Sequence, residues 1–382
     1  MKYWRGYLVA GILAVCSWGL MELAKNYSTL VDMIYPYMTR MVVSGLADWS
    51  FDLDICLWQL IAVLLGLGLL ASIVLMIVLR WNPIQWFGWV LAVASLLFLA
   101  HSGIYGLNYY TGSVAEDVRV ELTDYTIAEL EEAATYFRDE ANKLALTVPR
   151  QSGELSYPDF DTLARQAGEG FRFLTYEKIQ PVFAGTTLPV KKLSWSDRYS
   201  SQGITGVTVA LTGESAVNPD TPAVILPYVM CREMCHRMSI AKEQDAAFAA
   251  FLVCAANSAP EFQYAAYFMA YRYCMDAMSS LTTSTGQAAA NRVKAGVNAQ
   301  LRWDLDTYDA FFAGSDGAAT AGSAIYLQKT YLEGIEIPSV CDLLTSWYVQ
   351  EFILPLQVEE EVVFDPFDES QVDLSGMVPS GR

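Results

Sequence analysis

The stretch ICLWQLIAVLLGLGLLASIVLMIVL, from Ile55 to Leu79, contains no charged side chain. A helix rises about 1.5 Å per residue, so this stretch is long enough to cross the roughly 30 Å hydrocarbon core of a bilayer. Two other stretches, Gly6–Met21 and Trp81–Ala115, also lack Asp, Glu, Lys and Arg. The sequence therefore predicts a membrane domain over residues 1–115, with transmembrane helices at about 6–24, 55–79 and 84–108.

The first of these stretches also fits a signal peptide, because a basic start precedes a short apolar run. No convincing small-x-small cleavage site follows it. In LAVC, Leu13–Cys16, the side chain of Val15 is too large for the residue before a lipoprotein cysteine. We therefore expect a retained membrane anchor.

Basic residues indicate how the predicted helices are oriented. Lys2 and Arg5 precede the first helix, and Arg80 lies in the tight turn between the second and the third. The loop predicted over residues 22–54 carries two basic side chains against five acidic ones. Because basic residues are retained on the cytoplasmic side, we expect a multi-pass membrane protein with a cytoplasmic N-terminus and an extracytoplasmic C-terminal domain.

The acidic excess lies outside the membrane domain. The chain has a formal net charge of −18, and residues 1–115 hold five basic and five acidic side chains. The remaining residues therefore carry the whole excess. Such a surface repels nucleic acid and anionic lipid headgroups, so we expect neither as its partner. The lipid bilayer is the expected partner of the three spans.

The remainder of the chain reads mainly as helix. TIAELEEAATYFRDEANKLAL begins with Thr126 and Glu129 in capping-box spacing. DFDTLARQAGEGFRFL predicts a weaker helix, interrupted by Gly168 and Gly170. Further helices are expected on both sides of a break near Ser239, from 261 to 281, near 286–313 and 318–332, and from 339 to about 352.

One short β-branched stretch, Ile204–Leu211, predicts a strand, and TGESAVNPDTP after it predicts a turn-rich connection. The expected fold is therefore mainly α. Three transmembrane helices precede a predominantly helical domain over residues 116–356 with a short β edge. An acidic, disordered tail is expected over residues 357–382.

The stretch CREMCH, Cys231–His236, nearly matches the pattern His-Glu-x-x-His. On a helix that pattern presents two imidazoles to one zinc ion, and its Glu acts as the general base. Here Glu233 and His236 stand in place, but Arg232 occupies the position of the first His. A guanidinium stays protonated and cannot bind a cation. The chain has only one other His, His101, at the outer end of the third predicted helix.

Glu243 is a candidate further ligand, seven residues after His236. On one straight helix the two would lie about 10 Å apart along the axis, too far for a common metal. The chain must therefore turn between them. A glycine at position 239 would allow that turn easily, and Ser239 allows it less readily.

Several stretches resemble an uncharacterised family of bacterial membrane proteins, a domain of unknown function with three N-terminal spans and an HExxH ectodomain. They include YPYMTR, GLNYY, SWSDRYSSQGITGVTVALTGESAVN and LPYVMCREMCHRMSIAKEQDAAFAAFLVC. The resemblance covers roughly residues 30–350. It implies a zincin-like metallopeptidase domain, with Ile204–Leu211 as the edge strand beside an extended substrate.

The resemblance also implies roles for individual side chains. These are Glu233 as general base, His236 with Glu243 or Asp245 as zinc ligands, and Tyr264 or Tyr267 as oxyanion donors. Zinc is the implied cofactor only if this site is retained.

The sequence departs from the family pattern at Arg232, Ser239, Asp245 and Ala247, where the family has His, Gly, Glu and Asn. These changes predict a catalytically degenerate relative, without zinc, that binds an extended peptide or an envelope protein in the old substrate cleft. Two alternatives remain open: an active zinc metallopeptidase with altered ligands, and a structural envelope protein. We further hypothesise that an ion pair of Arg232 near His236 and Glu243 replaces the positive charge of the metal.

Overall fold

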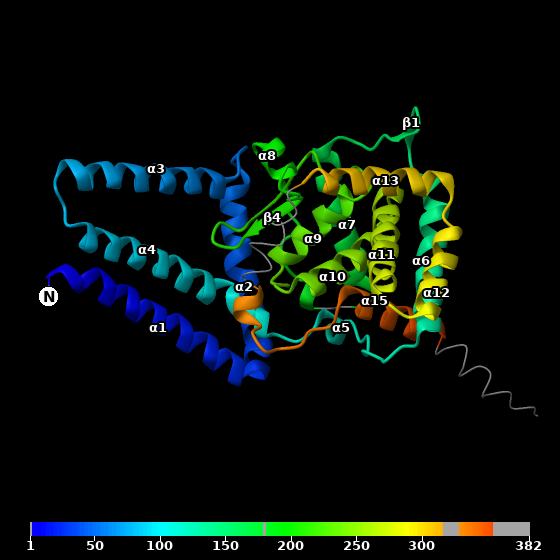
Figure 1. The fold of residues 1–382 in the computed structure, drawn as a ribbon, viewed down its shortest axis with the longest axis horizontal. Coiled ribbons are helices and arrows are strands. Elements are labelled where there is room, and N and C mark those ends of the chain that lie inside the picture. The colour runs from blue at the N-terminus through cyan, green and yellow to red at the C-terminus, as the bar shows by residue number, and fades with distance from the viewer. Residues whose placement is uncertain (1, 179–180, 316–327, 354–382) are drawn as a thin grey trace, which may run out of the picture.

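The computed structural model describes residues 2–178, 181–315 and 328–353, and its described part is 70% helical with few strands. Three helices are long and apolar enough to cross a membrane: α1 (Arg5–Asn26), α3 (Leu57–Val78) and α4 (Pro83–Ile104). They coincide with the three predicted spans, with ends shifted by a few residues. Figure 1 shows all three projecting from one side of a helical body. A 3-10 turn, η1 (Lys2–Trp4), precedes α1.

Helices α1 and α4 pack closely because glycines meet where they cross. A Cβ added to Gly6 would lie 2.5 Å from the carbonyl carbon of Gly88, and one added to Gly88 would lie 2.8 Å from the ring of Tyr7. Small residues at such crossings let two backbones approach in a membrane. Helix α3 lies apart from this pair along most of its length, and no residue of its most apolar window is buried.

The predicted loop over residues 22–54 is wrong. The chain forms α2 there (Ser28–Phe51), a long helix with Pro36 inside it. In Figure 1 α2 runs across the ends of the spans, between them and the helical body. The acidic residues in this stretch suggested a surface loop, whereas its apolar residues recur at helical spacing.

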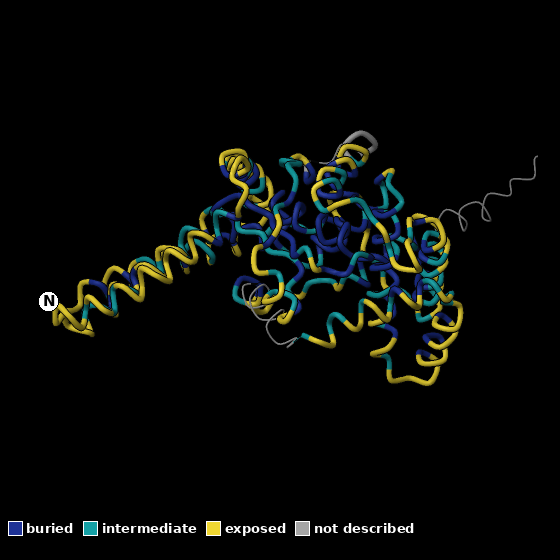
Figure 2. The backbone as a smooth tube through the Cα atoms, turned by 90° about the horizontal axis from the view of Figure 1, so that it is seen from above, coloured by how far each residue is buried: buried dark blue, intermediate teal, exposed yellow. Residues whose placement is uncertain are grey.

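The helical body is built on a continuous apolar core, shown as the dark interior in Figure 2. Its helices are α5 (Val114–Asp117), α6 (Ile127–Ala145), α7 (Phe160–Lys178), α8 (Ser196–Ser200), α9 (Leu226–Arg237), α10 (Glu243–Ala256), α11 (Pro260–Ser280), α12 (Ser284–Ala295), α13 (Ala299–Ala313) and α15 (Val340–Tyr348). Short turns join them: η2 (Gly106–Tyr110), η3 (Pro181–Phe183) and the π-helical η4 (Val349–Ile353). The capping box of Thr126 and Glu129 at the start of α6 is confirmed.

Several predicted helix boundaries differ from the structure. Helix α7 is continuous through Gly168 and Gly170. Gly170 does not break the helix but lets it approach α10, since a Cβ added to Gly170 would lie 2.9 Å from the Val253 side chain. The single helix predicted over 286–313 is two, since Asn298 caps the start of α13. Most of the helix predicted at 318–332, and the tail predicted at 357–382, lie outside the described residues.

A small sheet lies between the body and the membrane helices. Its strand order is β3 (Lys191–Lys192), β5 (Glu214–Val217) and β4 (Gly206–Val209). Strand β3 is parallel to β5, and β4 is antiparallel to it. The predicted strand is confirmed as β4, but the connection predicted as turn-rich contains β5. A separate hairpin joins β1 (Arg150–Gln151) to β2 (Glu154–Leu155).

Strand β5 also fixes the start of α3. The Glu214 carboxylate accepts the backbone N–H groups of Leu57 and Trp58, each at 2.8 Å. The Lys191 ammonium lies 2.9 Å from the same carboxylate and donates to the carbonyl of Ser50 at 2.6 Å. One buried ion pair therefore holds the end of α2 and the beginning of α3 against the sheet.

Candidate functional site

Helix α9 carries the CREMCH stretch into the core. Pro227 lies in its first turn, where the missing N–H costs nothing. Every residue of α9 is buried except Arg232, whose side chain lines a cavity. Glu233 and His236 line the same cavity. The helical prediction for this stretch is confirmed, and its polar residues share one wall.

The predicted turn at Ser239 is also present. Ser239 has φ +74°, a left-handed conformation that favours glycine. The Tyr105 hydroxyl supports the turn by donating to the carbonyl of His236 at 2.9 Å. The chain then starts α10 at Glu243, whose Oε2 lies 3.5 Å from Nε2 of His236. The reversal brings together two residues that one straight helix would have separated.

The His236 imidazole is held in a defined orientation. Its Nδ1 lies 2.8 Å from the carbonyl oxygen of Ile240. A carbonyl only accepts, so Nδ1 carries a hydrogen and Nε2 faces the cavity. Metal-binding histidines are commonly oriented by this kind of backbone bond.

Both carboxylate oxygens of Glu233 are occupied by protein groups. Oε1 lies 2.9 Å from Nη2 of Arg232, and Oε2 accepts from Oγ1 of Thr208 at 2.8 Å. The Glu233 side chain is only 3% exposed, and that of Arg232 is 22% exposed. A general base directs a carboxylate oxygen at its water, and here each oxygen of Glu233 already contacts one protein group.

The cavity has a volume of about 680 Å³ and is lined mostly by apolar surface. Its size falls within the range of about 300–1,000 Å³ typical of ligand sites. One wall is the segment from Gly203 to Leu211, which includes all of β4. His101, Tyr105 and Tyr109, at and just beyond the end of α4, line the membrane side. The cavity therefore lies where the helical body meets the spans.

Strand β4 has a free edge along this cavity. Within the described residues, β4 pairs only with β5. The Asn218 N–H donates to the Thr205 carbonyl at 2.8 Å, which makes these residues a hydrogen-bonded pair next to the ladder. Such pairs alternate in an antiparallel ladder, so the backbone groups of Gly206 and Thr208 face the free edge. An extended chain in the cavity could add to that edge.

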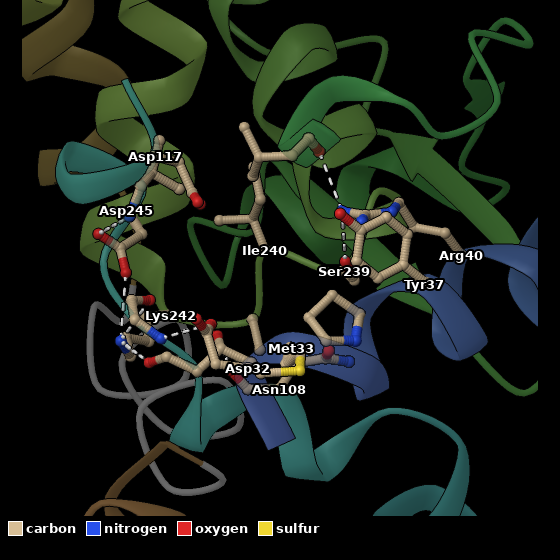
Figure 3. Close-up of a pocket in the computed structure, with 16 residues that line it drawn as sticks. Asp32, Met33, Tyr37, Arg40, Asn108, Asp117, Ser239, Ile240, Lys242 and Asp245 are labelled. Atoms are coloured by element: carbon tan, nitrogen blue, oxygen red, sulfur yellow. Dashed lines mark hydrogen bonds and ion pairs between the residues drawn. The ribbon is translucent and has the colours of Figure 1, made fainter. Parts of the chain in front are cut away.

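Asp245 does not join the cluster. Its Oδ1 accepts from Oγ of Ser113 at 2.6 Å, and its Oδ2 lies 3.5 Å from Nζ of Lys242. As Figure 3 shows, it lies instead at a second cavity of about 250 Å³, opposite Arg40 and Ser239. Of the two alternative carboxylates, only Glu243 lies beside His236.

The two tyrosines predicted as oxyanion donors also lie elsewhere. The Tyr264 hydroxyl donates to Oδ2 of Asp304 at 2.5 Å, and that carboxylate is paired with Arg150. Tyr267 packs against Phe251 and other core rings. The tyrosines that line the cavity are Tyr105, Tyr109, Tyr228, Tyr273 and Tyr308. The sequence offered a signal for two of them, Tyr105 and Tyr109. They lie in or directly before the GLNYY stretch, which follows the third span.

Opposite charges balance within the cluster. Burial opposes the charged form of His236, but the adjacent Glu243 carboxylate outweighs it and raises the pKa of His236. Burial likewise opposes ionisation of Glu243, yet His236 and then Arg232 lower its pKa to about 2. Burial disfavours the Arg232 cation, and Glu233 and Glu243 together raise its pKa. Two basic and two acidic side chains therefore share this wall.

The side chains present do not make a zinc site of the usual kind. Such a site takes three protein ligands and one water. Here His236 and Glu243 converge, but Arg232 brings a fixed positive charge to the third position and Asp245 is turned away. Within residues 2–178, 181–315 and 328–353, no group of three or more His, Cys, Asp or Glu side chains is placed to hold a metal ion.

Comparison with known proteins adds a family but no activity. No curated protein and no solved structure matches the chain. One family model, described as "Protein of unknown function (DUF3810)", matches residues 30–335. That match includes α2, two of the three apolar helices and the whole cavity wall formed by α9 and β4. The chain therefore belongs to the DUF3810 family of proteins of unknown function.

Proposed function

We propose that this chain is a membrane-anchored, zincin-like binding protein that holds an extended peptide segment of an envelope partner without hydrolysing it. The observation that carries the proposal is the free edge of β4 beside the cavity, with Arg232 bound to Glu233 at its wall. Strand addition uses backbone groups for affinity and nearby pockets for side-chain selection.

The proposed loss of hydrolysis is supported by the contacts within the cluster. The ion pair with Arg232 and the bond from Thr208 engage both oxygens of Glu233. Arg232 also supplies, within the protein, a positive charge that a zinc ion would otherwise bring. Binding at this wall therefore needs neither a metal nor an activated water.

We place the helical body outside the cytoplasm of a bacterial cell, because Lys2, Arg5 and Arg80 lie at the ends of the spans that are remote from the body. The partner is then a peptide segment close to the membrane surface. The cavity begins at His101 and Tyr105, at the end of α4.

The first experiment measures zinc in the full-length chain, purified in nanodiscs without chelator, for the wild type, Arg232→His and the matched control Arg232→Gln. We expect no stoichiometric zinc in the wild type or the Gln variant. We expect about one zinc per chain in the His variant, whose three ligands would be the new imidazole, His236 and Glu243. Stoichiometric zinc in the wild type would support the alternative, an active peptidase, and would overturn the proposal.

A second experiment tests the mode of binding. Short unstructured peptides carrying a fluorophore are screened by anisotropy against the wild type, and the best binder is resynthesised with N-methyl groups on alternate residues. Strand addition predicts that one methylation register abolishes binding and the other leaves it nearly intact. Equal binding in both registers would contradict strand addition. Failure to find any peptide binder would favour the structural alternative.

A further inference from the structure

Helix α2 has two faces of opposite character. Its buried residues, among them Thr39, Arg40, Val43, Ala47 and Ser50, lie against the body and the end of α4. Thr39 Oγ1 donates to the carbonyl of Ile104 at 3.0 Å. The exposed large apolar side chains of α2 are Leu30, Met33, Ile34, Tyr37, Met38, Met41, Val42, Trp49 and Phe51. At about 100° per residue, all of these fall within one half of the helix circumference.

This exposed half is too apolar for a surface that faces water. Met41 is 72% exposed, Trp49 68% and Met33 65%. Soluble surfaces rarely gather so many large apolar side chains in one contiguous patch. Asp48 is the charged residue on this half, and it lies near enough to the Arg237 guanidinium to favour its charged form.

The chain connections fix where α2 can lie. Only Tyr27 separates α1 from α2, and residues 52–56 separate α2 from α3. Both ends of α2 are therefore tied to the ends of apolar spans on the same side, and Figure 1 shows α2 crossing those ends. The exposed face of α2 is thus continuous with the surface that the spans present to lipid.

We propose that α2 is an interfacial helix whose exposed half contacts the lipid bilayer, at the boundary between headgroups and acyl chains. Amphipathic helices in this position bury their apolar face in that boundary. Trp49 has an amphipathic ring of the kind that is enriched there, whereas the Tyr37 ring lies under the Arg40 guanidinium at the second cavity. The opposite face of α2 does not have to face solvent, because the helical body covers it. This inference is independent of the proposed function.

The test compares two sites of equal exposure in the full-length chain in phospholipid nanodiscs. Met41→Cys is the probe, and Leu146→Cys, at the end of α6 on the side of the body remote from the spans, is the control (Figure 1). Their native side chains are 72% and 73% exposed. Both variants carry Cys16→Ser, because Cys16 is exposed and the other six cysteines are buried. Each is spin-labelled, and its collisions with oxygen and with a water-soluble nickel complex are measured.

For each label we compare the ratio of its collision rate with oxygen to its collision rate with the nickel complex. We expect this ratio to be about ten-fold higher at position 41 than at position 146, because oxygen concentrates in lipid. Met38→Cys, on the same half and 54% exposed, should repeat the result if the first variant folds poorly. Equal nickel access at both sites would place α2 in water and overturn the proposal. Shielding of position 41 from both reagents would also overturn it, since a protein surface such as a second copy would then cover this face.

Discussion

Replacing Glu214 by Gln should release the start of α3 from the helical body. The Glu214 side chain is 1% exposed, accepts two N–H groups from the first turn of α3 and pairs with Lys191. Removing one partner of a buried ion pair costs about 3–5 kcal/mol, and the charge at a buried helix N-terminus contributes up to about 2 kcal/mol. Gln keeps one acceptor oxygen, and Lys191 keeps its bond to the Ser50 carbonyl. We therefore expect a loss near the lower end, about 3 kcal/mol.

Cys56 provides the assay, because its thiol is 1% exposed and lies at this junction, 3.3 Å from the carbonyl of Lys192. With Cys16→Ser as background, alkylation of Cys56 is followed by mass spectrometry under native conditions. A loss of about 3 kcal/mol corresponds to roughly a hundred-fold faster labelling. Glu154→Gln, at an exposed carboxylate, is the matched control and should leave the rate unchanged. An acceleration below about three-fold in Glu214→Gln would refute the reasoning that this carboxylate holds α3.

Three further predictions concern a turn, a helix crossing and the charged cluster. Ser239→Gly should raise the free energy of unfolding by about 1 kcal/mol, because the left-handed φ of +74° strains any residue with a Cβ. Denaturant unfolding measures this change, and a loss of stability in the variant would contradict the prediction. Gly6→Leu should lower the melting temperature in nanodiscs, because its side chain would overlap the Gly88 backbone. A Cβ added at Gly11 meets nothing within 4 Å, so the control Gly11→Leu should not lower it. The raised pKa of His236 means that its contribution to stability is full below pH 6.5 and is lost as pH rises through the folded pKa. Stability measured from pH 5 to 9 should therefore fall more steeply in the wild type than in His236→Gln, and parallel curves would contradict this pairing.

The pH effect should be modest because the pair is partly open to solvent. The Glu243 side chain is 33% exposed, so water screens its attraction to His236. The lowered pKa of Glu243, about 2, has the opposite sign: its contribution is present above the ordinary value of 4.5 and is lost as pH falls toward 2. The two titrations together place the greatest stability from this pair between about pH 5 and 6.5.

Local sequence rules predicted the parts of this protein that depend on local physics. Three stretches without charge, of which Ile55–Leu79 is one, predicted three helices long and apolar enough to cross a membrane. The spacing of Arg232, Glu233 and His236 placed them together on one helix, and the distance to Glu243 required a turn at Ser239. All of these features depend on neighbouring residues, and the structure has each of them.

Long-range contacts decided the rest. Helix α2 was missed because its segment was treated as a loop between two apolar stretches, and only the folded structure shows its buried residues against the body. The choice of Glu243 over Asp245 depends on how α10 docks against α5, where Ser113 and Lys242 hold Asp245. The cavity takes its tyrosines from the end of α4, from η2 and from α9, α11 and α13. Tyr264 and Tyr267 face Asp304 and the core instead. Residue spacing fixes which side chains share a helix face, but only the packing of distant segments decides what each face meets.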